Sequence, residues 1–113
     1  MGVTVVLVGP TAAGKSHLAA ELVRHYRAEK KPAEIVNADS MLIYRGMDIG
    51  TAKPSVSERA ETRHHMIDLL DVNETWTVAE FQQVARAAIA DCQTRNVVPI
   101  AVACGALALV AAL

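Results

Sequence analysis

The sequence predicts an α/β fold in which helices flank a parallel sheet. Short apolar runs rich in β-branched residues alternate with segments of helical periodicity, as in chains built from strand–helix–strand units. The length of 113 residues fits one small domain. Hydrophobic residues make up 52% of the chain and charged residues 20%, which argues against disorder. Because crossovers in such sheets are right-handed, the loops after the strands should line one edge, where ligands bind.

The first half of the chain reads as strand, loop, helix, strand and loop. Residues 3–8 form an almost wholly apolar run, typical of a strand covered on both faces. A loop follows, and a helix is predicted from Lys15 until the sequence turns polar before Pro32. Its apolar face consists of Leu18, Ala19, Leu22, Val23 and Tyr26. Residues 34–37 are predicted as the second strand, and residues 45–54, with two glycines and a proline, as a long loop.

The second half repeats the alternation. Ser57 is predicted to cap a short helix at residues 58–62, and residues 65–70 are predicted as the third strand. Thr77 and Glu80 have the spacing of a capping box, so a second long helix should begin after Thr77. The apolar face of that helix consists of Phe81, Val84, Ala85, Ala88, Ile89 and Cys92. Asn96 is predicted as a left-handed stop, and residues 97–103 as the fourth, buried strand.

Charge and cysteine content exclude several classes of protein. The 11 Lys+Arg and 12 Asp+Glu give a net charge of −1, which excludes a protein held to nucleic acid mainly by charge but not a local basic surface. Cys92 and Cys104 are too few for a disulfide framework and no secretory signal precedes them, so we expect a cytoplasmic protein. Residues 97–113 carry no charge, but Pro99 and Gly105 favour a strand and the start of a helix over a membrane span. We expect no membrane contact, and an end inside this run is typical of a truncated longer protein.

The loop between the first strand and the first helix carries the clearest chemical signal. Gly9-Pro10-Thr11-Ala12-Ala13-Gly14-Lys15-Ser16 matches the pattern G-x-x-x-x-G-K-[ST]. Such a loop points several backbone N–H groups inward, and the following helix adds its positive end. Lys15 adds a full charge for the phosphates, and the Ser16 hydroxyl is a ligand for Mg²⁺. The sequence therefore predicts a P-loop NTPase-like fold that binds phosphate or diphosphate, and leaves a kinase, an NTPase and a diphosphate-dependent transferase open.

A carboxylate follows the second strand on the same predicted edge. Asp39 is placed to accept a proton from a nucleophile beside the loop, or to hold Mg²⁺ through water. The alternative is that Asp39 or Ser40 caps a helix that starts at Met41. The residues alone do not separate these interpretations.

Basic and imidazole side chains are scattered over the next stretch. Each cation there is either a solvated surface residue or part of a positive rim for a polyanion; these cations are Arg45, Lys53, Arg59 and Arg63. His64 and His65 are adjacent, and neighbours on a strand point to opposite faces. We therefore expect hydrogen-bonding roles for them rather than shared metal ligation.

With these residues in view, residues 5–102 resemble the N-terminal third of the tRNA dimethylallyltransferases, also called tRNA isopentenyltransferases. The most specific part of the resemblance is residues 34–54, EIVNADSMLIYRGMDIGTAKP. Residues 64–71, HHMIDLLD, and residues 79–83, AEFQQ, match further motifs in the family's order.

The resemblance implies a prenyl transfer reaction. In this family the P-loop does not hydrolyse ATP but holds the diphosphate of dimethylallyl diphosphate with Mg²⁺, and by this match residues 11–16 would contact the prenyl donor. The Lys15 charge, the loop amides and Mg²⁺ are suited to stabilise the departing diphosphate, so Lys15 is a predicted catalytic residue. The N6 amine of an adenosine next to the tRNA anticodon attacks the allylic carbon, and Asp39 matches the general base that takes its proton. The segment that contacts the substrate adenosine matches Asp39, Ser40, Met41 and Leu42.

The last segment departs from the family pattern. After the fourth strand the family has Gly-Gly-Thr/Ser-Gly-Leu-Tyr and a basic residue, where this chain reads ACGALALV at residues 103–110. The hydroxyl residue becomes Gly105, the tyrosine Ala108 and the basic residue Val110. The family's helical insertion that grips the anticodon arm lies outside these 113 residues. Residues 1–113 are thus expected to form a partial domain, the prenyl-diphosphate-binding core, with little or no transferase activity alone.

Three other functions remain open beside an impaired tRNA prenyltransferase. An adenylate dimethylallyltransferase shares the P-loop and the Asn-Ala-Asp string, and needs less nucleic-acid surface. A small nucleotide kinase would bind ATP with Mg²⁺ more tightly than dimethylallyl diphosphate. A non-catalytic P-loop remnant would bind diphosphate, or pair with another chain, without catalysing transfer.

Overall fold

A computed structural model describes residues 4–8, 15–38, 42–46, 54–71 and 73–103 of the chain. Strands and helices alternate along it in the predicted way. Their order is β1 (Val5–Val8), α1 (Lys15–Ala28), β2 (Ala33–Ala38), α2 (Val56–Glu61), β3 (His64–His65), α3 (Val78–Thr94) and β4 (Val98–Ala103).

The four strands form one parallel sheet in the order β1-β4-β2-β3. The strand that comes last in the sequence therefore lies between the two that come first. In the register, Ala103 of β4 pairs with Val8 of β1 and also with Ala38 of β2. These three strands consequently end at the same level, and the chain leaves all of them at one edge.

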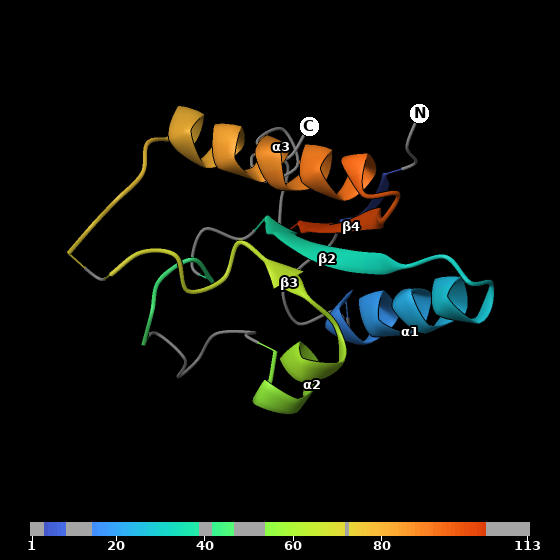
Figure 1. Cartoon of the computed structure of the whole chain (residues 1–113). Helices are drawn as coiled ribbons and strands as arrows, with labels where there is room; N and C mark the ends of the chain where they lie inside the picture. The colour runs from blue at the N-terminus through green and yellow to red at the C-terminus, as the bar shows by residue number, and fades with distance from the viewer. Residues whose placement is uncertain (1–3, 9–14, 39–41, 47–53, 72, 104–113) are drawn as a thin grey trace.

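Helices cover both faces of the sheet, with α3 on one side and α1 and α2 on the other (Figure 1). Under α3, one core cluster consists of Val36, Ile43, Met66, Leu70, Phe81 and Ala85. Under α1, a second consists of Ala19, Val23, Ala33, Ile35 and Ile100. Side chains alternate between the two faces along β2, so Ile35 lies in the cluster under α1 and Val36 in the cluster under α3.

Most of the predicted elements are confirmed. The first, second and fourth strands lie within two residues of their predicted bounds. Thr77 caps α3 through a complete capping box with Glu80, and Asn96 has the left-handed φ of 58° predicted for a stop. Among the described helices, none combines the length and apolar character that crossing a membrane requires.

Three predictions are wrong in detail. The cap of the short helix is Ser55 rather than Ser57, and the helix ends at Glu61. The third strand covers only His64–His65 instead of residues 65–70, because Met66 and Asp68 adopt left-handed φ values of 67° and 55° that break the extended chain. In α1, Leu18 is 46% exposed although its helical spacing predicts a core position.

Candidate functional site

The flanks of the predicted phosphate loop have the strand–loop–helix arrangement that such a loop requires. Strand β1 ends at Val8, and α1 begins at Lys15, with Ser16 in its first turn. The remaining predicted phosphate ligands lie outside the described residues, as do the side chains of Lys15 and Ser16; these ligands are Gly9, Pro10, Thr11, Ala12, Ala13 and Gly14. The described flanks therefore support the context of the loop, and its contacts with phosphate stay a prediction.

The predicted base follows β2 at the edge where β1 delivers the phosphate loop. Because Val8, Ala103 and Ala38 are in register, Gly9 and Asp39 are the first residues to leave this edge on either side of β4. Asp39, Ser40 and Met41 lie outside the described residues. Val8 and Ala38, the last described residues before the two predicted catalytic segments, thus lie at one edge of the sheet, on either side of β4.

The chain after Asp39 is fastened to the segment that follows β3. The Asp68 amide donates to the Leu42 carbonyl at 3.1 Å, and the Leu70 amide donates to the Ile43 carbonyl at 2.8 Å. Leu42 and Ile43 are buried, and turns instead of a helix follow at residues 42–46. Leu42, a predicted substrate contact, is 5% exposed and so anchors this segment in the core. Its contact with a substrate stays a prediction.

A cleft of about 520 Å³ opens beside this edge, between α1 and α2. Its floor includes Asn37 of β2, His64 of β3 and Val102 of β4, and His17 of α1 lies in its wall. His17 is two residues beyond Lys15, so the cleft begins next to the phosphate loop. The cleft therefore lies over the α1 side of the sheet, near the start of that helix.

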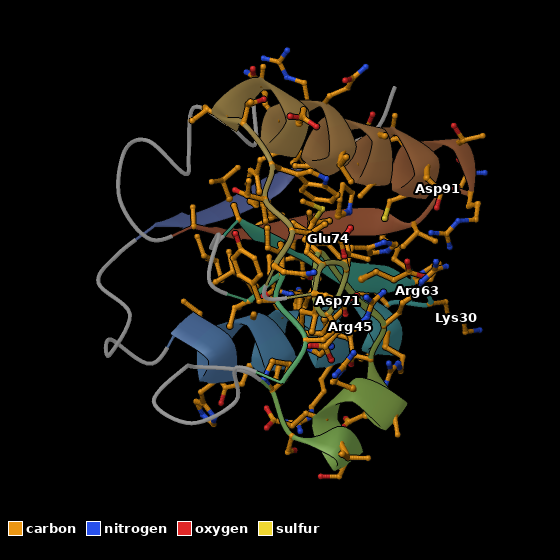
Figure 2. All side chains as sticks on the ribbon, turned by 90° about the vertical axis from the view of Figure 1, so that its left-hand side faces the viewer. Lys30, Arg45, Arg63, Asp71, Glu74 and Asp91 are labelled. Carbon is orange, nitrogen blue, oxygen red and sulfur yellow. The ribbon has the colours of Figure 1, made fainter. Side chains whose placement is uncertain are left out.

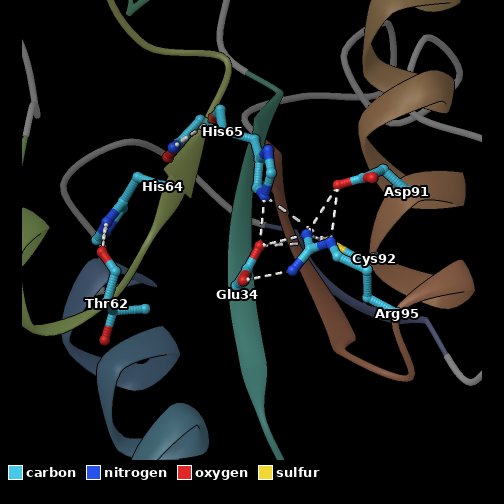
Figure 3. A network of polar contacts seen from close by, with 8 residues as sticks. Glu34, Thr62, His64, His65, Asp91, Cys92 and Arg95 are labelled. Carbon is cyan, nitrogen blue, oxygen red and sulfur yellow. Dashed lines mark hydrogen bonds and ion pairs between the residues drawn. The ribbon is translucent and has the colours of Figure 1, made fainter.

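Two polar residues on the floor of this cleft are fixed by backbone contacts. The Asn37 amide donates to the His65 carbonyl at 3.0 Å, and His64 Nδ1 lies 2.8 Å from the Thr62 carbonyl (Figure 3). Burial lowers the pKa of His64, which favours the neutral ring. In the tautomer whose Nδ1 donates to the Thr62 carbonyl, Nε2 is an acceptor. Sequence reasoning did not single out Asn37 for a role, although it stands two residues before Asp39 in the most specific motif.

Two of the four cations of the predicted positive rim form ion pairs with nearby carboxylates. Arg45 pairs with Asp71 at 3.0 Å, and the two side chains lie side by side in Figure 2. Arg59 pairs with Asp68 at 2.8 Å. Arg63 is exposed, and Lys53 lies outside the described residues. Arg45 and Arg59 consequently help to position the loop after β3 instead of presenting bare charge to a polyanion.

On the opposite face of the sheet, His65 belongs to a separate polar network (Figure 3). His65 Nε2 lies 2.7 Å from Glu34 Oε1, and Arg95 donates to both Glu34 oxygens at 2.8 and 3.0 Å. The hydrogen bonds from Arg95 hold the pKa of Glu34 at about 2, although burial opposes this. Cys92 Sγ completes the network and is a free thiol. His64 and His65 thus face different partners, as predicted.

Comparisons with known proteins give one consistent result. A family model described as IPP transferase matches residues 42–107, more than half of the chain. The chain is 52% identical over 98 residues to a tRNA dimethylallyltransferase of Bifidobacterium longum subsp. infantis. The matched region covers 87% of this chain and 30% of that protein.

Solved structures agree with the sequence relatives. The chain resembles the full-length tRNA isopentenylpyrophosphate transferase of Bacillus halodurans with a TM-score of 0.86 and 37% identity, over 99% of this chain and 35% of that one. It also resembles a eukaryotic dimethylallyltransferase acting on tRNA, with a TM-score of 0.76 and 32% identity, over 89% of this chain and 24% of that one. The chain thus spans about a third of the length of its bacterial relatives.

Proposed function

Because the chain belongs to the IPP transferase family, we propose that residues 1–113 form the prenyl-diphosphate-binding core of a tRNA dimethylallyltransferase. The reaction transfers a dimethylallyl group from dimethylallyl diphosphate to the N6 amine of an adenosine next to the tRNA anticodon. The observation that carries this proposal is the family match together with the strand–loop–helix context of residues 9–16. The expected location is cytoplasmic.

The loop and the start of α1 bind the departing diphosphate in this proposal. An exocyclic adenine amine is a poor nucleophile, because its lone pair is delocalised into the ring. Catalysis must therefore stabilise the leaving group, which the loop amides and the Lys15 ammonium group are suited to do. The Ser16 hydroxyl is a hard oxygen donor in the first turn of α1, which fits Mg²⁺. The ion, when bound, supplies positive charge against the diphosphate.

Asp39 takes the proton that the amine loses. Neighbouring strands lie about 4.8 Å apart, so the chain leaves β1 and β2 about 10 Å apart across β4. That separation leaves room for a diphosphate at the loop and a purine nitrogen beside Asp39, with the allylic carbon between them. A carboxylate there accepts the proton as the nitrogen becomes positive.

Binding of the prenyl donor by the isolated chain tests this proposal. Calorimetry with Mg²⁺ should show dimethylallyl diphosphate binding more tightly than ATP, whereas a nucleotide kinase would show the reverse order. Lys15→Ala should weaken binding of the diphosphate at least about tenfold, because it removes a charge-assisted contact. Lys31→Ala is the matched control, since Lys31 is exposed beyond the far end of α1.

Two results would contradict the proposal. One is tighter binding of ATP than of dimethylallyl diphosphate, and the other is equal loss of affinity in the Lys15→Ala and Lys31→Ala variants. Circular dichroism of each variant confirms that the helices are retained, so a loss of binding reports the loop and not unfolding.

A further inference from the structure

From the cluster of Glu34, His65 and Cys92 we infer a second metal site, for Zn²⁺, on the face of the sheet covered by α3. Among the described residues, one donor atom from each of these three side chains lies within 4.8 Å of the other two. The three residues come from β2, β3 and α3, which are far apart in the sequence. The site is separate from the proposed Mg²⁺ position at Ser16, which follows β1.

The spacing of the donor atoms fits a zinc ion. Cys92 Sγ lies 3.7 Å from His65 Nε2 and 3.8 Å from Glu34 Oε1, and the last two atoms are 2.7 Å apart. The circle through these three atoms has a radius of about 2.0 Å, so an ion up to about 1 Å above their plane lies about 2.0–2.3 Å from each of them. Tetrahedral coordination requires the 2.7 Å contact between His65 Nε2 and Glu34 Oε1 to open to about 3.3 Å when the ion replaces that hydrogen bond. That interval covers the Zn–N, Zn–O and Zn–S bond lengths found in proteins.

The chemistry of the donors also favours zinc over a hard cation. A thiolate and an imidazole select Zn²⁺, whereas Mg²⁺ and Ca²⁺ prefer sites made of oxygen. Burial raises the pKa of the Cys92 thiol to about 11, so zinc must displace its proton in order to bind. A water molecule supplies the fourth ligand of the tetrahedron.

The neighbouring arginine contacts two of the three donor atoms and must turn away from them when the ion binds. Arg95 Nη2 donates to Glu34 Oε1 at 2.8 Å and to Cys92 Sγ at 3.8 Å, whereas Arg95 Nη1 donates at 3.0 Å to Glu34 Oε2, a contact that is compatible with Oε1 as the metal ligand. Arg95 Nη2 also donates to Asp91 Oδ2 at 2.8 Å, so this nitrogen keeps a partner when Oε1 turns to the ion. Metal-bound carboxylates are commonly held by such outer hydrogen bonds.

The position of the cluster suits a structural ion. The Glu34 and His65 side chains are 15% and 10% exposed, and Cys92 is fully buried. Zinc there would join the edge strand β3, only two residues long, to β2 and to α3. The expected consequence is a more stable chain, because an ion that binds only the folded state adds its binding free energy to folding.

Metal binding by the purified 113-residue chain tests the inference. Titration with Co²⁺, which replaces Zn²⁺ spectroscopically, should produce a thiolate-to-metal charge-transfer band, and saturating Zn²⁺ should remove it and raise the melting temperature. Cys92→Ser should abolish the band and weaken Zn²⁺ binding more than about 100-fold, since even outer-shell changes cost about 10–100-fold. Cys104→Ser, which removes the other cysteine in the sequence, should leave both readouts unchanged.

Three outcomes would overturn the inference. They are no charge-transfer band in the unaltered chain, a band that survives Cys92→Ser, and a band that is lost in Cys104→Ser. If Cys92→Ser fails to fold, X-ray absorption of the zinc-loaded unaltered chain decides, because the inferred site has one sulfur ligand and all its other ligands nitrogen or oxygen. A zinc spectrum without sulfur would then refute the site.

Discussion

Glu34 is kept ionised by contacts from two other elements of the fold. Arg95 donates to both of its oxygens, and His65 Nε2 lies 2.7 Å from Oε1. The pKa of Glu34 is consequently about 2, against 4.5 for a free glutamate. Between these two pH values the unfolded chain binds a proton that the folded chain does not, so acid favours unfolding.

Glu34→Gln should remove this part of the acid sensitivity. In the metal-free chain, stability supplied by Glu34 is complete above about pH 4.5 and is lost as the pH falls toward about 2. Allowing for screening by solvent, the loss amounts to about 1–2 kcal/mol. Urea unfolding in EDTA across this interval measures it, and the Gln variant should show a shallower pH dependence. Glu21→Gln, which alters an exposed pair with His17, is the matched control. Equal slopes for Glu34→Gln and the unaltered chain would contradict this account.

Gly105 is the residue at which a small change should strengthen donor binding. In the family pattern the matching position carries a hydroxyl, which is expected to lie against the diphosphate. Gly105→Ser should therefore tighten binding of dimethylallyl diphosphate, by about tenfold if one hydrogen bond to a charged group forms. Gly105→Ala is the control, because it adds the same β-carbon without the hydroxyl. Equal affinities for the two variants, measured by calorimetry, would argue against that role.

For single residues, the sequence predicts roles where a local motif exists, and it does not predict contacts that only the fold creates. Lys15 and Asp39 were assigned because each belongs to a motif that can be read locally. Cys92 was assigned only to an apolar helix face. Its partner Glu34 is 58 positions away, and no local pattern reports a contact of that kind.

Helix α3 depends on its first turn. Thr77 accepts a hydrogen bond from the Glu80 amide at 3.1 Å, and Glu80 accepts one from the Thr77 amide at 3.1 Å. Thr77→Ala should lower the free energy of unfolding by about 1 kcal/mol, as measured by urea denaturation. Thr75→Ala lies in the preceding exposed segment and should change it by less than about 0.5 kcal/mol. A smaller effect at position 77 than at position 75 would contradict the capping role.

Ser55, which precedes α2, and Ser57, which lies in its first turn, offer a direct test of the corrected helix start. Ser55 Oγ accepts from the Glu58 amide at 3.2 Å, and the Ser55 amide donates to Glu58 Oε1 at 3.0 Å. Ser55→Ala should raise the amide exchange rates within α2, by about fivefold for a loss near 1 kcal/mol. Ser57→Ala, inside the helix, should leave them nearly unchanged. The reverse order would support the cap predicted from the sequence.

The errors at the element scale have different physical origins. The cap at Ser55 was readable, because Glu58 stands three residues later, whereas the third residue after Ser57 is Ala60. The short third strand was not readable. Residues 66–70 are mostly apolar and look like a strand, yet Met66 and Leu70 reach the core from turns with left-handed residues. The apolar composition of residues 66–70 thus reflects the burial of their side chains and not an extended backbone.

At the scale of the whole molecule, we expect the chain to retain donor binding but to lack prenyl transfer. The isolated 113-residue chain should bind dimethylallyl diphosphate but transfer no measurable label to tRNA. An adenosine must leave its stack to react, at a cost of about a few kcal/mol, and by the family resemblance the contacts that hold it are expected outside these 113 residues. Incubation of tRNA with radiolabelled donor measures transfer, and a longer relative serves as the positive control. Label in the tRNA from this chain alone would contradict the expectation.

The overall architecture was predictable because it rests on periodicity. Alternating apolar runs and amphipathic segments fixed the parallel sheet and its two covered faces. The order β1-β4-β2-β3 was not predicted, since pairing between distant strands leaves no local signal. That order sets the separation of Val8 and Ala38, the strand ends that precede the phosphate loop and Asp39 in the sequence. The position of the two strand ends therefore depends on the part of the fold that the sequence reveals least.

The place of β4 has a consequence for how the protein is made. During synthesis β1 and β2 emerge from the ribosome first, yet in the register described neither pairs with the other, and each pairs with β4. In a nascent chain that ends before residue 98, the edges of β1 and β2 that pair with β4 therefore have no partner strand. Unpaired strand edges of this kind are prone to aggregation, and chaperones protect such intermediates. Among the described strands, β1 joins the other three only when β4 has inserted between β1 and β2.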